Sequence, residues 1–255
     1  MRVRTAVITA AGFGNRLQPA TAVIPKVMLP LIDTPAIQMV VVEALEAGVE
    51  RVVLVVGHGA DLVRRHFEKV VGPWRGVIEW VVQPRMRGLA DAIHCARSAV
   101  GEEPFAVLFG DCVFLEGNPT RTLMEDFEVH GHSALIAERV KRGDISKRGI
   151  FETEGTQGDR LLVRSVVEKP SPDEAPSDLA VAGRCLFTPG VFPALAEVTP
   201  DASGERHLAP AINRLLESEP VAVRLIPERR LDIGNPEDYV AAIQAVAAHR
   251  GLLQE

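Results

Sequence analysis

Short, continuously apolar runs alternate with helical patterns through the first half of this 255-residue chain. The runs are rich in Val, Ile and Leu, and they lie at 6–10, 51–57, 76–83 and 104–111. Helical periodicity follows them at 35–48, 60–70, 88–100 and 120–132. Strands that are apolar on both sides must be covered on both faces. The sequence therefore predicts an α/β fold, with a Rossmann-like mixed, mostly parallel sheet covered by helices on both faces.

The second half has a different pattern. Residues 148–170 read as two strands around a Gly-rich turn, which predicts a hairpin. A strand is expected at 179–187, a helix at 208–219 and a strand at 221–227. Asn235 and Pro236 form the start signal of a last helix. We interpret 1–255 as a single domain, in which 141–255 brings antiparallel additions to the part formed by 1–140.

Charge and cysteine content exclude several classes of function. The net charge is −6 and the pI is about 5.7, so no general basic field attracts nucleic acid or an anionic membrane. No segment approaches the roughly 20 apolar residues that cross a bilayer. Cys95, Cys112 and Cys185 are odd in number and widely spaced, which favours a reduced, cytoplasmic protein over a disulfide framework. We expect Cys112 to be a small buried hydrophobic residue.

The loop after the first strand carries the first functional signal. Gly12 and Gly14 follow the strand, and Arg16 and Lys26 lie in the same proline-punctuated segment. Backbone N–H groups crowd around an anion only where side chains are absent, and fixed cations complete a phosphate site. A plain strand-to-loop turn is the alternative. The loop is no GxxxxGK[ST] phosphate loop, and a GxGxxG dinucleotide fingerprint fails at Leu17, which argues against an NAD-dependent oxidoreductase.

The stretch AAGFGNRLQPATAVIPKVMLPLIDTPAIQMVV strongly resembles the bacterial UTP–glucose-1-phosphate uridylyltransferases of the sugar nucleotidyltransferase superfamily. Further blocks follow in the family's order through nearly the whole chain: AGVERVVLVVGHG, QPRMRGLADAI, FAVLFGD, VVEKPSPDEAPSDLAVAGR, GERHLAPAI and LDIGNPEDY. The resemblance implies a nucleotide-diphospho-sugar transferase fold, with a nucleotide-binding part at 1–140 and a sugar-binding part at 141–255. It also implies nucleotidyl transfer, in which a sugar 1-phosphate attacks the α-phosphorus of a nucleoside triphosphate and pyrophosphate leaves.

This chemistry needs cations and a metal more than it needs a nucleophilic side chain. The attacking phosphate oxygen is already anionic at pH 7, so orientation and electrostatics carry the reaction. A hard cation such as Mg²⁺ prefers carboxylate oxygens. The resemblance assigns the metal to Asp111 and Asp232, each of which alone would read as a turn aspartate. Together with these, it assigns catalysis to Arg16, Lys26 and Lys169.

The resemblance also distributes the substrate contacts. It assigns nucleotide contacts to Ala10, Ala11, Gly12, Gly14 and Arg16. It assigns base recognition to Gln83 together with Gly88. It assigns contacts with the sugar phosphate to Gly149, Glu168, Lys169 and Glu205. We add His207, which departs from the family's usual residue and lies in the same expected pocket. For His207 the hypothesis is a hydrogen bond to a sugar hydroxyl. Solvent-facing roles are the alternatives for Gln83 and for the ion pair formed by Glu168 and Lys169.

Departures from the family leave the substrates open. Ala22, Val27, Asp91, Cys185 and the segment 206–210 differ from the usual residues around base and sugar selection. UTP with glucose 1-phosphate is the first hypothesis, and dTTP or another nucleotide with a different sugar or cyclitol 1-phosphate is the alternative. A catalytically weak, regulatory protein that binds nucleotide sugars is the alternative of another class. The resemblance implies a homo-oligomer, either a dimer or a tetramer.

Overall fold

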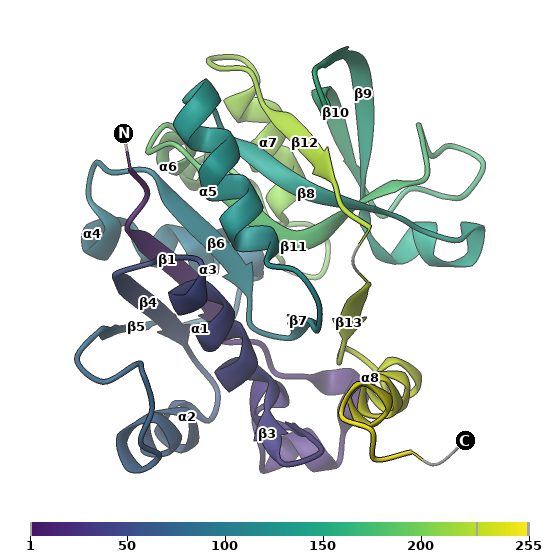
Figure 1. The fold of residues 1–255 in the computed structure, drawn as a ribbon. Helices are drawn as coiled ribbons and strands as arrows, with labels where there is room; N and C mark the ends of the chain where they lie inside the picture. The colour runs from purple at the N-terminus through teal and green to yellow at the C-terminus, as the bar shows by residue number, and fades with distance from the viewer. Residues whose placement is uncertain (1, 228, 254–255) are drawn as a thin grey trace.

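The computed structural model describes residues 2–227 and 229–253, and one large sheet runs through it (Figure 1). The sheet has nine strands: β1 (Thr5–Ala10), β4 (Arg51–Val56), β5 (Ile78–Val82), β6 (Phe105–Phe109), β8 (Ala134–Arg139), β9 (Gly149–Gln157), β10 (Arg160–Glu168), β11 (Leu179–Phe187) and β12 (Ala222–Leu225). Their order is β5-β4-β1-β6-β11-β8-β12-β10-β9. Neighbours from β5 to β6 pair in parallel, and β11 joins β6 antiparallel. The expected mixed sheet is confirmed.

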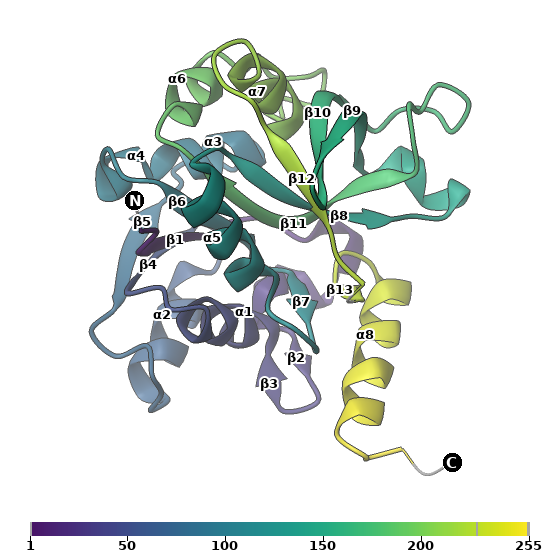
Figure 2. The ribbon, with the colours of Figure 1, turned by 45° about the horizontal axis from the view of Figure 1, so that its top comes forward.

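Helices cover both faces of this sheet (Figure 2). They are α1 (Ala36–Glu46), α2 (Ala60–Lys69), α3 (Leu89–Cys95), α4 (Arg97–Val100), α5 (Pro119–His130), α6 (Val191–Ala196), α7 (Leu208–Leu215) and α8 (Pro236–His249). Side chains of β1 alternate between two cores: Ile8 belongs to the one that includes residues of α1 and α5, whereas Val7 belongs to the one that includes residues of α3, α6 and α7. Both sides of the strand are therefore apolar, which explains its continuous hydrophobic run.

Short elements complete the fold. Single 3-10 turns lie at Asn15–Leu17, Ala20–Ala22 and Lys26–Met28, and a longer one lies at Arg142–Lys147. β2 (Pro30–Leu31) pairs with β3 (Thr34–Pro35), and β7 (Cys112–Phe114) pairs antiparallel with β13 (Arg230–Asp232). The sequence patterns did not predict β7, β13 or α6, and the helix expected at 88–100 divides at Ala96 into α3 and α4. The predicted hairpin is confirmed as β9 and β10.

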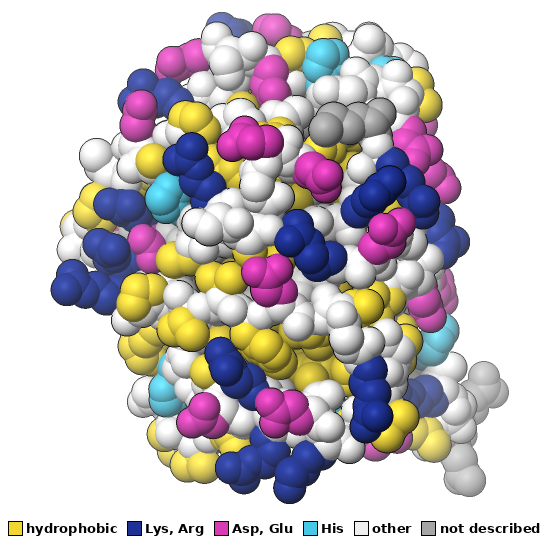
Figure 3. Space-filling model, turned by 90° about the vertical axis from the view of Figure 1, so that its left-hand side faces the viewer, with side chains coloured by type: hydrophobic (Ala, Val, Ile, Leu, Met, Phe, Trp, Pro, Cys, Tyr) yellow, Lys and Arg dark blue, Asp and Glu magenta, His cyan; other side chains and the backbone are white. Residues whose placement is uncertain are grey.

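The surface carries mixed charges on the face that includes β5 and α4. Figure 3 shows basic and acidic side chains interspersed there, with apolar groups between them. On this face no large area of one sign is visible. No helix within residues 2–227 and 229–253 is long and apolar enough to cross a membrane.

Candidate active site

A cleft of about 460 Å³ opens at the carboxyl end of β1. The loop after the strand forms one wall of this cleft. A Cβ at Gly12 would meet nothing within 4 Å, so the backbone there is open to a ligand. Gly14 has a φ of 69°, and a Cβ there would come within 3.1 Å of Lys26 Cβ. Thr21 Oγ1 also donates to the Gly14 carbonyl at 2.8 Å. Glycine at position 14 thus lets the loop fold back and bring Lys26 to the mouth of the strand.

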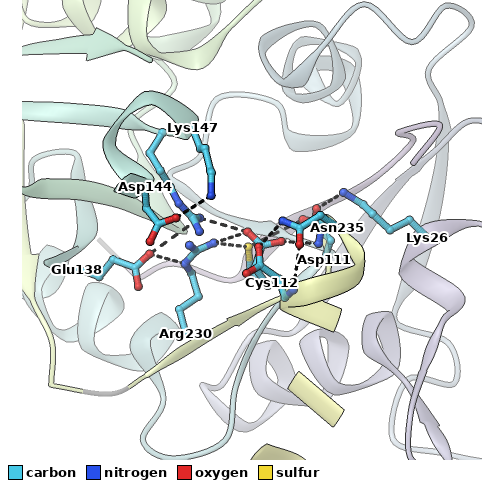
Figure 4. A network of polar contacts seen from close by, with 12 residues as sticks. Lys26, Asp111, Cys112, Glu138, Asp144, Lys147, Arg230 and Asn235 are labelled. Atoms are coloured by element: carbon cyan, nitrogen blue, oxygen red, sulfur yellow. Dashed lines mark hydrogen bonds and ion pairs between the residues drawn. The ribbon is translucent and has the colours of Figure 1, made fainter. Parts of the chain in front are cut away.

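Lys26 and Asp111 meet in this cleft, although 85 positions separate them in the chain. Lys26 Nζ donates to Asp111 Oδ2 across the gap between the loop and the end of β6 (Figure 4). Burial alone would lower the pKa of Lys26, but the carboxylates of Asp111 and Asp232 outweigh it and raise that pKa. Burial would likewise raise the pKa of Asp111, but the Lys26 ammonium outweighs it and lowers that pKa. Both groups are therefore charged at neutral pH.

Asp232 lies beside Asp111 because β13 pairs with β7. In that register Asp232 stands opposite Cys112, and the Ile233 N–H donates to the Asp111 carbonyl at 3.2 Å. The Gly234 N–H donates to Asp232 Oδ1 at 2.7 Å, which fixes the carboxylate. Asp111 and Asp232, which are 121 positions apart in the chain, therefore both present their carboxylates to one cleft.

Two arginines face Asp232 from the opposite side. Arg148 Nη1 lies 3.2 Å and Arg230 Nη1 lies 2.9 Å from Asp232 Oδ2. Arg230 Nε also donates to Glu138 Oε1 at 2.6 Å, as Figure 4 shows. Burial raises the pKa of Glu138 against the pull of Arg230. The Asp232 carboxylate is thus paired with two arginines, of which Arg148 lines the cleft.

Cys112 is buried behind these charges, as expected. Its side chain is 2% exposed, and its sulfur lies 3.3 Å from Arg230 Nη1. Burial raises the pKa of the Cys112 thiol to about 12, so the thiol is neutral at physiological pH. A neutral, enclosed thiol is a poor nucleophile. Its position beside Asp111 therefore reflects packing.

A second, smaller cavity of about 180 Å³ adjoins the first. Gly149 and Glu168 line it together with His207, Asp111 and Asp232. His207 Nδ1 lies 3.3 Å from Glu168 Oε1, and its Nε2 lies 2.8 Å from Asp201 Oδ2. The imidazole is therefore held between two carboxylates at the point where the two cavities meet.

Twelve of the predicted site residues line the larger cleft: Ala10, Ala11, Gly12, Gly14, Arg16, Lys26, Gln83, Gly88, Asp111, Glu205, His207 and Asp232. Within the described chain, Lys169 lines neither cavity. Its ammonium lies 3.5 Å from Glu168 Oε1, and its side chain is 40% exposed. The structure thus brings most of the predicted set together, and the roles assigned to these residues stay predictions.

Sequence reasoning missed Lys147, Arg148 and Asn235, which line the same cleft. Lys147 and Arg148 belong to a polar segment in which cations look solvent-exposed. Their adjacency to Gly149, a predicted sugar-site residue, is the only signal in the sequence that could have found them.

Comparison with known proteins identifies the family. Residues 5–249 match the nucleotidyl transferase family. The chain is 37% identical to the UTP–glucose-1-phosphate uridylyltransferase YngB of Bacillus subtilis, over 92% of this chain and 86% of that one. It is 36% identical to a UTP–glucose-1-phosphate uridylyltransferase of Streptococcus pyogenes, over 92% and 85%.

Solved structures agree with this assignment. A UDP-glucose pyrophosphorylase complexed with UDP-glucose superposes with a TM-score of 0.91 at 29% identity, over 96% of this chain and 99% of that one. A UTP-bound enzyme of the same type from Acinetobacter baumannii superposes with a TM-score of 0.83 at 27% identity, over 96% and 93%. The expected nucleotide-diphospho-sugar transferase fold is confirmed. The chain belongs to the nucleotidyl transferase family and is an enzyme of that class.

Proposed function

We propose that this protein joins UTP and glucose 1-phosphate to form UDP-glucose and pyrophosphate. One observation carries the proposal: a single cleft at the mouth of β1 gathers the glycine loop, Arg16, Lys26 and both carboxylates. Its similarity to uridylyltransferases supports the choice of substrates. An oxygen of the sugar phosphate attacks the α-phosphorus of UTP, and the bond between that phosphorus and the bridging oxygen of pyrophosphate breaks.

The chain's own groups would orient two mutually repelling anions. The open backbone at Gly12 and the guanidinium of Arg16 would hold the β- and γ-phosphates, which leave together. Lys26 would turn from Asp111 to the α-phosphate, where charge develops in the transition state.

Arg148 lines both cavities and would turn from Asp232 to the phosphate of the sugar. Glu168 would accept a hydrogen bond from one sugar hydroxyl, and His207 would donate one to another.

The residues present fit a magnesium ion. Within the described residues, no three His, Cys, Asp or Glu side chains gather closely enough to form a metal cage. Mg²⁺ is commonly held by one or two carboxylates together with substrate phosphates, which matches Asp111 and Asp232. Among the side chains that the structure describes, Asp111 Oδ1 accepts a weak contact from the Cys112 thiol at 3.9 Å, which leaves lone pairs for a cation. When bound there, the ion would neutralise phosphate charge and help to align the reacting groups.

A substrate matrix tests this function. Pyrophosphate release is measured for UTP, dTTP, CTP, ATP and GTP, each with glucose 1-phosphate and several other sugar or cyclitol 1-phosphates, with and without Mg²⁺. The proposal predicts the fastest release with UTP, glucose 1-phosphate and Mg²⁺. Fastest release with another pair reassigns the substrates. No release from any pair, combined with measurable binding of a nucleotide sugar, would overturn the activity in favour of a regulatory protein.

Two expectations from the family resemblance accompany this function. We propose that the protein acts in the cytoplasm as a homo-oligomer, either a dimer or a tetramer. Size-exclusion chromatography with light scattering measures the mass in solution. A mass near that of the 27.6 kDa chain would contradict the oligomer.

A further inference from the structure

The side chain of Gln83 is held in one orientation at the end of β5. It is 3% exposed and lines the larger cleft. Its amide nitrogen donates to the Gly88 carbonyl at 3.2 Å and to Asp91 Oδ2 at 2.8 Å. A primary amide has two N–H groups, so both donors are occupied. Because both neighbours are acceptors, the positions of the amide nitrogen and oxygen follow from the network.

The amide oxygen is left as the polar atom that a ligand can reach. No donor in residues 2–227 or 229–253 forms a hydrogen bond with Gln83 Oε1. Among the described residues, Gln83 Oε1 is not one of the polar atoms that are both fully buried and without a partner. Because Gln83 lines the cleft, this oxygen is accessible from it. The Gln83 amide therefore presents a fixed hydrogen-bond acceptor to the cleft, and both of its N–H groups are already used elsewhere.

Asp91 imposes this orientation. Its side chain is 8% exposed, and it is not among the residues that line the described cleft. Asp91 Oδ1 faces two guanidinium groups, Arg87 Nη2 at 3.5 Å and Arg206 Nη1 at 3.9 Å. A carboxylate that faces two guanidinium groups has only acceptor oxygens to offer its other neighbours. Gln83 must then turn its NH₂ group toward Asp91.

Close packing keeps the surrounding segment in place. The Arg206 N–H donates to the Arg87 carbonyl at 2.7 Å, and the Ala90 N–H donates to the Arg206 carbonyl at 3.0 Å. Gly88 has a φ of 93°, and a Cβ there would come within 2.7 Å of the Arg206 carbonyl oxygen. Neither neighbour of the amide can therefore move aside cheaply.

We propose that Asp91 is a positioning residue that selects the nucleotide base by locking Gln83 as an acceptor. The proposal rests on the function proposed above, and it names the base class as a pyrimidine with a hydrogen on N3, which is uracil or thymine. Cytosine has a lone pair on N3, and that lone pair would face the lone pairs of Gln83 Oε1. Accepting cytosine would require the amide to turn its NH₂ group away from a buried carboxylate, which is costly.

The test replaces Asp91 by Asn and measures the dissociation constants of UTP and CTP by calorimetry, with Mg²⁺ and without sugar phosphate. In Asp91→Asn the carboxamide oxygen is drawn to the two arginines, so its NH₂ group faces Gln83 and favours the flipped amide. The preference for UTP over CTP should fall by about tenfold. Asp61→Asn, at the exposed start of α2, is the matched control and should keep the wild-type preference.

A double-mutant cycle separates positioning from a general structural effect. In the Gln83→Ala background, Asp91→Asn should no longer change the UTP-to-CTP ratio, because the amide through which it acts is gone. An unchanged ratio in the single variant overturns the proposal, and so does an equal fall in both backgrounds.

If Asp91→Asn does not fold, Asp91→Ser removes the charge with a smaller side chain and must also lower the UTP-to-CTP ratio. If the wild-type protein binds CTP as tightly as UTP and dTTP, the assignment of uracil or thymine as the base is wrong. This result is independent of the pyrophosphate-release assay that tests the proposed function.

Discussion

Two clusters of paired charges contact Cys112, one at its backbone carbonyl and the other at its sulfur. They differ in how far they are exposed to the cleft. Arg184 donates to the Cys112 carbonyl at 2.9 Å and forms a two-point pair with Glu43 at 2.8 and 2.6 Å. Arg230 contacts the Cys112 sulfur and pairs with Asp232 beside the cleft. The Arg184 side chain is 1% exposed, whereas that of Asp232 is 20% exposed. One cluster is sealed inside the protein, and the other opens onto the cleft.

The difference indicates separate purposes for similar chemistry. Thr120 Oγ1 donates to Glu43 at 2.7 Å and the Gly183 carbonyl accepts from Arg184, so the sealed pair has its hydrogen bonds supplied by the protein. In the cleft, the Arg148 Nε is buried without a partner in the described chain. Groups that are satisfied internally hold a structure together. Groups whose partners can be exchanged are suited to receive phosphate.

The largest expected effect follows from removing a cleft charge. Asp111→Asn should lower turnover on the order of 10³-fold or more, because it removes a carboxylate proposed to hold the metal. The fold should remain, since this side chain lies in a cleft and not in the core. Turnover is measured by pyrophosphate release, and folding by circular dichroism. Asp33→Asn, in an exposed pair with Arg250, is the matched control. Wild-type turnover in Asp111→Asn would remove Asp111 from the metal site.

Breaking the sealed pair of Arg184 and Glu43 should lower stability and leave turnover nearly unchanged. Arg184→Met leaves the Glu43 carboxylate buried without its cation, which should lower the free energy of unfolding by about 3–5 kcal/mol. Turnover per folded molecule should stay within severalfold of wild type well below the melting temperature. Urea unfolding and an activity assay at low temperature measure the two quantities.

The double variant Glu43→Leu/Arg184→Met sharpens this result. Replacing both charges by apolar groups should recover much of the lost stability, because no unpaired charge remains. A double variant as unstable as the single one would mean that Arg184 acts through its bonds to Gly183 and Cys112 instead of through Glu43.

A smaller effect is expected where the cleft meets the sugar cavity. His207→Ala should raise KM for glucose 1-phosphate about three- to tenfold, the usual size for one lost hydrogen bond, and leave KM for UTP nearly unchanged. Initial rates at varied concentrations of each substrate provide both values. An unchanged KM for the sugar phosphate would remove His207 from sugar binding.

The smallest effect concerns pH. The folded pKa of Asp111 lies below its ordinary value, so this group contributes stability above the ordinary carboxyl pKa of about 4. That contribution is lost as the pH falls through the lowered folded pKa. The stability difference between wild type and Asp111→Asn should therefore shrink between about pH 5 and pH 3. Urea midpoints across this range measure it, and a difference that is constant with pH would contradict the lowered pKa.

The sequence predicted long regular elements better than short ones. The continuous apolar runs of β1, β4 and β6 were visible because each is buried on both faces. β7 and β13 have three residues each, too few for any periodicity, and they form only because distant segments meet. These two strands carry Cys112 and Asp232, so the frame of the proposed metal site could not be derived from local pattern.

The candidate site was predictable where a motif marks it. The glycines and cations after β1 have a local signature, whereas Arg148 and Asp91 look like ordinary surface residues of a loop and a helix. Their importance depends on contacts with Asp232 and Gln83, which only the folded chain brings near. The resemblance to a family supplied the pairing of Asp111 with Asp232, which no spacing rule would have given.

A crystal structure with Mg²⁺ and a UTP analogue that cannot transfer its nucleotide would show where the triphosphate binds. We expect the triphosphate in the cleft at the carboxyl end of β1, with its phosphates along Gly12 to Arg16 and its base against Gln83. The carboxylates of Asp111 and Asp232 would hold the metal, which would neutralise phosphate charge. A triphosphate that is ordered elsewhere on the protein, with this cleft empty, would contradict this expectation.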